Sequence, residues 1–533
     1  MSTQTISSTP SSSRAFTALV VAALAITTAR AQVSGSGDYS PNTLASPTWN
    51  VGDSLTVGDT TNASLVINST GSVSNTSGTI ANGSGSTSSV TVSGGTWTNS
   101  EYLYVGFSGN GTLAISGNGS VSNTYAIIGV NSGSNGNVTV SGGTWNTPAG
   151  LTVGDSGNGT LAISDNGSVF SNGASIGGFV TGNGSATVSG GSWTVSGFMN
   201  VGLAGNGTLS ISGNGSVSAQ LVTLGQNANR TGMVNLNGGI LSTGQVKKAN
   251  GAATATFNGG TLRLTLNQSI LFYNFDPGGV ILTGTGGTID TQSFNVATAQ
   301  GLTGNGSLTK KGNGTFTITG NSSYSGGTTV STGKLLVNNS DGSGLGSGNV
   351  TVANSATLGG TGAFTGNVTV NGTLSPGASI ETLASGSLSF SNNSTFAYEI
   401  DSSLSPGDRA DLQIVTGDLE LAALVTLAVD DLATTDTAFT YGTKFALLNY
   451  SGNWNGGLFT YGTAISDDAQ FTVGLNTWTL NYNDTTGGEN FTGEYVPGSF
   501  VTLTAVPEPA TYALLALAGA TLFILKRRTI ANA

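Results

Sequence analysis

The chain has 533 residues with 84 glycines, 25 acidic residues and only 14 basic residues, so its formal net charge is −11. It contains neither cysteine nor histidine, which excludes disulfides, thiolate metal sites and the usual general base of enzymes. Because the sequence has no basic stripe that could displace the counterions of phosphate groups, nucleic acid is not an expected partner. We also expect no metal and no cofactor.

The N-terminus has the features of a secretory signal peptide. Arg14 precedes the apolar run "AFTALVVAALAITT", and Ala29 and Ala31 follow it in a small-x-small pattern. This order is typical of a segment that is cleaved on export. We therefore predict a signal peptide over residues 1–31 and a mature chain that begins at Gln32. An N-terminal membrane anchor is the alternative, which the short length of the run disfavours.

Residues 32–250 repeat with a period of 48 residues. The segment "GNGTLAIS" begins at Gly109 and again at Gly157, a register that a disordered glycine-rich linker has no reason to keep. Within each half of a repeat, apolar residues such as Leu113 and Ile115 alternate with polar ones, which is the period of a half-buried strand. Pairs such as Asn118-Gly119 are expected to provide positive φ at the turns.

Each half-repeat has room for three short strands, which make one rung of a right-handed parallel β-helix. The predicted fold class is therefore all-β, with two rungs in each 48-residue repeat. A single rung cannot bury its own apolar face, so only the stack is stable. The alternative is a set of antiparallel sheets built from hairpins at the Asn-Gly turns.

Tryptophan and valine are expected to alternate in one column of the stack. They recur at steps of 24 residues: Trp49, Val73, Trp97, Val121, Trp145, Val169, Trp193 and Val217. Since valine has no ligand chemistry, we interpret the column as buried core, where each valine contributes roughly 1.5–3 kcal/mol. Binding of sugar rings by the tryptophans is the functional alternative.

Residues 251–377 keep the strand alternation but lose the 48-residue period. Positions within Gly304–Asn339 fill the frame L-x-K-x-G-x-G-T-x-x-x-x-G-x-[NS]-x-Y-[ST]-G-x-T-x-[VI]-x-x-G-x-L: Leu308, Lys310, Gly312, Gly314, Thr315, Gly320, Tyr324, Gly326, Thr328, Val330, Gly333 and Leu335. This segment resembles the passenger-associated repeat of bacterial autotransporters, which implies a further β-helical stretch of a kind displayed on cell surfaces. Residues 378–505 contain β-like stretches such as "STFAYEID", and we expect a C-terminal β region that caps the solenoid.

Residues 506–533 combine a proline-rich motif, an apolar run and a basic cluster. As a helix, Thr511 to Leu525 spans about 22 Å, against about 30 Å for the hydrocarbon core of a bilayer, so we predict a single, minimal transmembrane helix. The basic cluster after it predicts a cytoplasmic C-terminus. The motif and the cluster consist of Val506, Pro507, Glu508 and Pro509, followed by Lys526, Arg527 and Arg528.

This order resembles the PEP-CTERM sorting signal. The resemblance implies transient anchoring in the inner membrane, recognition of Glu508 and its neighbours by an exosortase, removal of the tail, and transfer to the cell surface or extracellular matrix. A permanent anchor is the alternative.

Candidate catalytic groups are few. Asp59, Asp155 and Asp165 fall at turns where other repeats have uncharged residues, so we interpret them as turn residues. The acidic residues between 401 and 431 could hold a cation, but solvated loop charge is the preferred interpretation. Because no nucleophile–base pair is visible, we predict no catalytic residue and no enzyme.

The sequence therefore predicts an exported structural protein of the cell surface or extracellular matrix, associated with exopolysaccharide or with neighbouring copies. An adhesin or carbohydrate-binding surface protein is the alternative. A β-helical polysaccharide-degrading enzyme is less favoured, since the repeats lack facing carboxylates.

Overall fold

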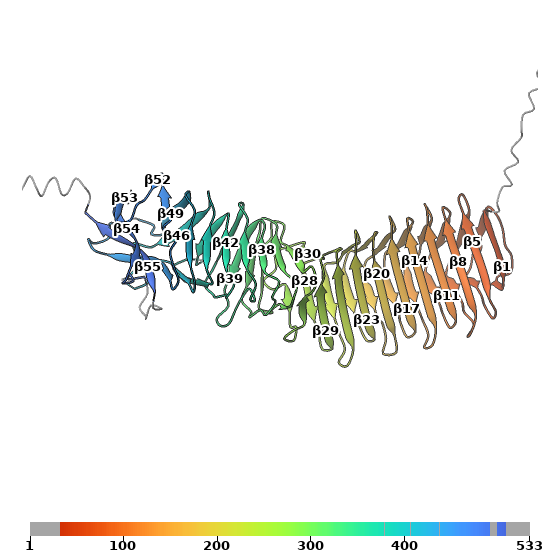
Figure 1. The fold of residues 1–533 in the computed structure, drawn as a ribbon. Helices are drawn as coiled ribbons and strands as arrows, with labels where there is room; N and C mark the ends of the chain where they lie inside the picture. The colour runs from red at the N-terminus through yellow and green to blue at the C-terminus, as the bar shows by residue number, and fades with distance from the viewer. Residues whose placement is uncertain (1–31, 378, 406, 436, 491–497, 508–533) are drawn as a thin grey trace, which may run out of the picture.

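The computed structural model describes residues 32–507 except 378, 406, 436 and 491–497. Every regular element among these residues is a β-strand. Figure 1 shows the strands stacked along one long axis, in chain order from the N-terminal end to a C-terminal cap.

Three sheets form the faces of the solenoid over its N-terminal half. Sheet A contains β1 (Val33–Gly37), β5 (Ala63–Asn68), β8 (Thr87–Ser93), β11 (Asn110–Ser116), β14 (Asn135–Ser141), β17 (Asn158–Ser164), β20 (Asn183–Val188), β23 (Asn206–Ser212), β26 (Thr231–Asn237), β29 (Ala252–Phe257), β32 (Val280–Leu282) and β35 (Thr303–Gly304). Sheet B contains β2 (Tyr39–Ser40), β4 (Leu55–Val57), β7 (Gly78–Ile80), β10 (Tyr102–Val105), β13 (Tyr125–Ile128), β16 (Gly150–Val153), β19 (Ala174–Ile176), β22 (Phe198–Val201), β25 (Leu221–Leu224), β28 (Gln245–Lys248) and β31 (Phe272–Tyr273).

Sheet C runs through most of the stack. It contains β3 (Thr48–Asn50), β6 (Ser72–Asn75), β9 (Thr96–Asn99), β12 (Ser120–Ser122), β15 (Thr144–Thr147), β18 (Ser168–Ser171), β21 (Ser192–Val195), β24 (Ser216–Ser218), β27 (Ile240–Thr243), β30 (Thr261–Leu264), β33 (Gly287–Asp290), β36 (Leu308–Lys311), β38 (Thr328–Val330), β40 (Val350–Val352), β42 (Val368–Val370), β45 (Leu388–Phe390) and β48 (Leu419–Leu421).

Two further sheets complete the C-terminal part. Sheet D contains β34 (Val296–Thr298), β37 (Thr315–Ile318), β39 (Gly333–Val337), β41 (Ala356–Gly360), β43 (Thr373–Pro376), β46 (Thr395–Ile400), β49 (Val425–Asp431), β51 (Phe459–Tyr461) and β52 (Thr463–Ala464). Sheet E has the order β44 (Thr382–Ser385), β47 (Leu412–Val415), β50 (Lys444–Tyr450), β55 (Ser499–Val506), β54 (Asn476–Asp484) and β53 (Ala469–Val473).

The pairing of neighbouring rungs is parallel, which confirms the predicted parallel β-solenoid. Leu113 of β11 lies opposite Val90 on one side and Val138 on the other. The antiparallel-hairpin alternative is wrong, because the turn at Asn118-Gly119 leads from sheet A into sheet C instead of back along the same sheet. At the N-terminal end, β1 and β2 pair antiparallel with β5 and β4, and so cover edges that could otherwise template aggregation.

The predicted tryptophan–valine column is confirmed. Val121 of β12 lies opposite Trp97 and Trp145 in the adjacent strands, and this register recurs along sheet C. The side chains of Trp97 and Trp193 are fully buried and Trp145 is 1% exposed. These rings are therefore core, and the sugar-binding interpretation of the tryptophans is wrong.

Buried polar groups in sheet C satisfy the indole N–H groups. Trp97 Nε1 donates to Asn75 Oδ1 at 2.7 Å, and Trp145 Nε1 donates to Asn123 Oδ1 at 2.8 Å. Each acceptor comes from the valine-bearing rung that precedes its tryptophan. The alternation of valine and tryptophan rungs thus provides both the volume and the hydrogen-bond partner that a buried indole needs.

The turns between sheets A and C differ in detail from the prediction. The positive φ belongs to the residue before the Asn-Gly pair, with values of 57° at Gly117, 49° at Asp165 and 53° at Gly213. Gly119 is required for a different reason, because a Cβ there would lie 2.3 Å from the carbonyl oxygen of Val92 in the preceding rung. The pair permits close approach of two rungs and does not supply the left-handed residue.

The C-terminal end of the stack is closed by antiparallel strands. β50 pairs antiparallel with β55, β55 with β54, and β54 with β53. Beneath them, the rings of Phe439, Phe445 and Trp478 lie with centroids 5.1–5.9 Å apart. Across the described ranges, no helix has the length and apolar character that would let it span a bilayer.

Replacing Trp145 with alanine should lower the free energy of unfolding by about 3–5 kcal/mol, because it leaves a large cavity in the column and removes the donor to Asn123. Urea-induced unfolding followed by circular dichroism measures the effect. Phe170→Ala is the matched control: Phe170 lies on the outer face of sheet C and is 38% exposed, so we expect a change within about 0.5 kcal/mol. Equal midpoints for the two variants would contradict the core assignment.

Candidate functional site

The described residues begin beside the predicted signal cleavage position. Ala29 and Ala31 lie outside the described residues, whereas the carbonyl of Gln32 accepts a hydrogen bond from the backbone N–H of Asn68 at 2.8 Å. Strand β1 starts at the next residue. A mature chain that began at Gln32 would therefore keep the whole N-terminal covering of the solenoid.

The sorting motif follows directly on the cap. Val506 is the last residue of β55, where it lies opposite Thr477 of β54, and Pro507 comes next. The other predicted residues of the tail lie outside the described residues, as does the predicted transmembrane helix: Glu508, Pro509, Lys526, Arg527 and Arg528. The strand that leads into the motif is central in sheet E, paired on both sides.

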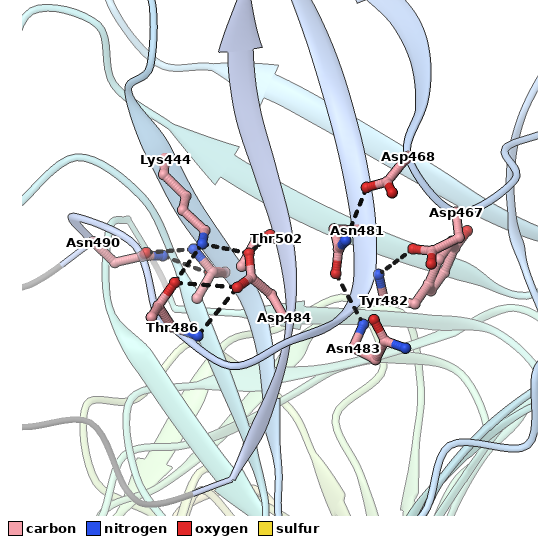
Figure 2. A network of polar contacts seen from close by, with 11 residues as sticks. Lys444, Asp467, Asp468, Asn481, Tyr482, Asn483, Asp484, Thr486, Asn490 and Thr502 are labelled. Carbon is pink, nitrogen blue, oxygen red and sulfur yellow. Dashed lines mark hydrogen bonds and ion pairs between the residues drawn. The ribbon is translucent and has the colours of Figure 1, made fainter.

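A polar cluster, shown in Figure 2, ties the cap strands together. The ammonium of Lys444 on β50 contacts the carboxylate of Asp484 and donates to Thr486 Oγ1 at 2.7 Å, while Thr502 of β55 donates to Asp484 Oδ2 at 3.0 Å. Burial acts to raise the pKa of Asp484, but the hydrogen bonds from Lys444, Thr486 and Thr502 outweigh it and hold the pKa below its usual value. The ionised Asp484 therefore links β50, β54 and β55.

Asn490 connects the cap to the last rungs of the solenoid. Its Oδ1 accepts the N–H of Ala446 on β50 at 2.7 Å, and its Nδ2 donates to the hydroxyl oxygen of Tyr398 on β46 at 3.0 Å. The same amide lies 2.6 Å from the carbonyl of Ala446 and 2.5 Å from that of Asp411. One buried side chain thus joins sheets D and E.

Asp411 is a buried carboxyl at the same junction. Its oxygens accept the backbone N–H groups of Glu381 at 3.0 Å and Glu399 at 3.1 Å. Burial raises the pKa of Asp411 to about 8, with the charges of Glu399 and Glu381 acting in the same direction and the two backbone hydrogen bonds acting against it. The junction between solenoid and cap therefore contains a group that titrates near neutral pH.

This raised pKa predicts a pH-dependent stability. Because an unfolded aspartate titrates near pH 4, the folded chain binds one more proton between about pH 4 and 8, and Asp411 then lowers stability by up to about 1.4 kcal/mol for each unit that the pH rises. As the pH rises through this window, we expect the unfolding free energy of the wild type to fall relative to that of Asp411→Asn. Urea titrations of both proteins at several pH values measure it. Parallel pH profiles would contradict the assignment.

The residues of the passenger-type frame have structural roles. Lys310 is fully buried, and its Nζ donates to the carbonyls of Gly312 at 2.6 Å and Thr332 at 2.9 Å, which closes the corner between sheets C and D. Burial lowers the pKa of Lys310 to about 8. The buried hydroxyl of Tyr324 pairs with Thr328 Oγ1 at 2.6 Å. These groups satisfy buried polar atoms and have no reactive partner among the contacts that they make.

The candidate acidic residues Asp59, Asp165 and Asp431 hydrogen-bond to nearby groups in turns or at the end of a strand. Asp165 adopts the left-handed conformation that its sister glycines adopt, and Asp59 accepts a hydrogen bond from Asn82 Nδ2 at 2.8 Å. In the region 401–431, Asp431 Oδ1 accepts the backbone N–H groups of Ser402 at 3.0 Å and Ala433 at 3.1 Å. No three acidic side chains in the described part of the chain converge as a metal site would require.

Sequence reasoning missed a set of outward-facing aromatic residues on sheet B. Tyr102, Tyr125 and Phe198 are 38%, 44% and 59% exposed. Each occupies the first position of its strand and lies next to an inward-facing residue, as in Tyr125 beside buried Ala126. The available signal was an aromatic residue at a polar position of an alternating strand. They line a groove on the outer surface of the solenoid.

Comparisons with known protein families identify two segments. Residues 308–337 match the model of the Passenger-associated-transport-repeat, and residues 505–528 match that of the PEP-CTERM protein-sorting motif. A search of curated proteins found no match. Both resemblances inferred from the sequence are confirmed, and the sorting motif implies export and surface sorting by an exosortase. The chain is a β-solenoid protein that carries a passenger-associated transport repeat and ends in a PEP-CTERM protein-sorting motif.

Proposed function

We propose that this protein is a structural component of the cell surface or extracellular matrix, which associates with exopolysaccharide after its tail has been processed. The observation that carries the proposal is the position of the sorting motif, whose match over residues 505–528 begins at the last two residues of β55. Removal of the tail after this strand would leave the paired strands of sheet E complete. We propose that Glu508 and its neighbouring prolines are recognised by the exosortase and have no catalytic role.

The outer edge of sheet A supports a structural role. The amides of five asparagines hydrogen-bond in series, with Nδ2 to Oδ1 distances of 2.8, 3.0, 3.2 and 3.3 Å: Asn110, Asn135, Asn158, Asn183 and Asn206. These side chains are exposed, so the ladder presents a regular row of uncharged donors and acceptors to the surroundings. Such a row suits many weak hydrogen bonds to a hydroxylated polymer.

We propose a non-catalytic role. The support is that the chain has no histidine or cysteine, and that Asp59 and Asp165, in turns, and Asp431, at the end of β49, hydrogen-bond to neighbouring side chains or backbone. Glycoside hydrolysis would need two carboxyl groups facing each other across a substrate.

The sorting proposal predicts the fate of a tail variant. Changing Pro507, Glu508 and Pro509 together to alanine should leave the C-terminal tail uncut and the protein in the membrane fraction, because the exosortase no longer recognises it. Intact-mass analysis of the C-terminus, together with fractionation of cells and matrix, measures both effects. Glu420→Ala, at an exposed position of β48, is the control and should be processed normally. An unchanged mature C-terminus in the triple variant would refute the proposal.

An adhesin is the second candidate, supported by the exposed aromatic residues of sheet B. A glycan array separates the two functions. Because the asparagine ladder is regular and uncharged, a matrix protein should bind many neutral glycans weakly, whereas an adhesin should bind one glycan far more strongly than the others. We expect the broad pattern, and a single sharp specificity would favour the adhesin.

A further inference from the structure

The outer face of sheet B contains a groove between the rungs of Tyr125 and Phe198. It encloses about 520 Å³ of open space, in the range of small-molecule sites. Its floor is formed by Gly150 and Gly173, and the hydroxyl residues Thr152 and Ser175 lie beside them. The groove crosses two rungs of the solenoid, so it extends along the stack and not along a strand.

The strand register sets the width of the groove. Tyr125 lies opposite Gly150 in the next strand. Gly173 comes directly before the residue that pairs with Leu151. In the strand after that, Phe198 comes directly before the residue that pairs with Ala174. The two aromatic positions are therefore three strand spacings apart, about 14 Å. This span accommodates more than one sugar ring between the aromatic walls.

The two floor glycines are not required by the backbone. Neither has a positive φ, and an ideal Cβ would have its nearest neighbours at 3.7 Å for Gly150 and 4.0 Å for Gly173. Gly154 in the same rung is different, because its φ is 72° and a Cβ would lie 2.3 Å from the carbonyl oxygen of Asn183. Larger residues would fit at Gly150 and Gly173, and they would fill the groove.

The aromatic wall is held in place by stacking. The rings of Tyr125 and Tyr102 lie 5.4 Å apart with an interplanar angle of 19°, and Tyr104 stacks on Tyr102 at 5.6 Å and 2°. Stacked rings lose little further freedom when a ligand packs on them, so less binding energy is spent on ordering the site. On the opposite side, Phe198 is the most exposed of the groove's aromatic residues.

The charges around the groove restrict the ligand. No lysine, arginine, aspartate or glutamate lines it. The surrounding residues 32–229 contain six acidic residues and no basic residue, which disfavours anionic polymers: Asp38, Asp53, Asp59, Glu101, Asp155 and Asp165. The same uniform charge disfavours the same face of a second copy of the chain. The complementary ligand is neutral, apolar on its ring faces and rich in hydroxyls at its edges.

We propose that this groove binds a segment of a neutral polysaccharide. The C–H face of a pyranose ring packs on Tyr125 or Phe198, and the sugar hydroxyls exchange hydrogen bonds with Thr152, Ser175 and Asn200. The proposal rests on the proposed association with exopolysaccharide and assigns it a site. A polymer that lies across successive rungs would align with the long axis of the solenoid.

The test uses the full chain in native affinity electrophoresis with three soluble neutral polysaccharides, hydroxyethyl cellulose, barley β-glucan and galactomannan, and with anionic polygalacturonate. We expect at least one neutral polymer to retard the wild type and polygalacturonate to leave its mobility unchanged. Two double variants should raise the apparent dissociation constant at least about tenfold: Tyr125→Ala with Phe198→Ala removes the walls, and Gly150→Leu with Gly173→Leu fills the floor. Phe170→Ala, at an exposed aromatic residue of sheet C outside the groove, should bind as the wild type does.

Several results would overturn the proposal: no retardation by any neutral polymer, equal binding by the groove variants, or retardation only by polygalacturonate. Analytical ultracentrifugation adds another, since a wild-type dimer that the groove variants lose would assign the groove to self-association. Circular dichroism and unfolding midpoints check that each variant is folded. The groove variants should still be processed at the C-terminus, so normal sorting with unchanged glycan binding would refute the groove alone and leave the sorting proposal standing.

Discussion

The constant register between rungs is the constraint on which the rest of this structure depends. A parallel solenoid places each residue directly above its counterpart one rung away, so a side chain that is buried in one rung is buried in all of them. The column that contains Trp97, Val121 and Trp145 shows the consequence. Its large and small side chains fill the interior in turn, and no single rung could bury either of them alone.

The same register also provides hydrogen-bond partners for polar groups that are buried in the interior. A buried indole needs an acceptor, and Asn75 and Asn123 provide it from the neighbouring valine rungs. Turn glycines such as Gly119 let the rungs approach to hydrogen-bonding distance. Because the interior residues supply the packing and the hydrogen bonds, the outward-facing positions contribute little to the stability of the stack. The outer face of sheet B can therefore vary between tyrosine, glycine and phenylalanine.

The two ends of the solenoid meet different demands. At the N-terminal end, two short antiparallel strands cover the first rung. At the C-terminal end the cap must both close the stack and deliver the sorting motif, and it does so through β55, a strand paired on both sides. Asn490 joins β50 to the last rungs, and the Lys444–Asp484 cluster joins β50, β54 and β55, so the motif follows a central strand of the cap.

Much of the fold and part of the functional organisation were predictable from local sequence. The 48-residue period predicted the rungs and the buried column, since a repeat of side chains along the chain becomes a stack in space. The order of proline motif, apolar run and basic cluster identified the sorting signal, because the family match rests on one continuous segment of the chain. The predicted position of the positive φ was wrong by one residue at Gly117. The pattern of glycines indicates where the chain turns but not which residue adopts the left-handed conformation.

Only the tertiary structure decided what depends on residues far apart in the chain. Asn490 contacts Tyr398, which lies 92 positions away in the chain, and burial beneath the cap raises the pKa of Asp411. No local sequence pattern indicates either feature. The groove arises in the same way, since Tyr125, Gly150, Gly173 and Phe198 become neighbours only when four successive rungs stack. Local sequence thus determined the periodic interior, whereas the non-periodic contacts that shape the cap and the outer surface depended on the assembled fold.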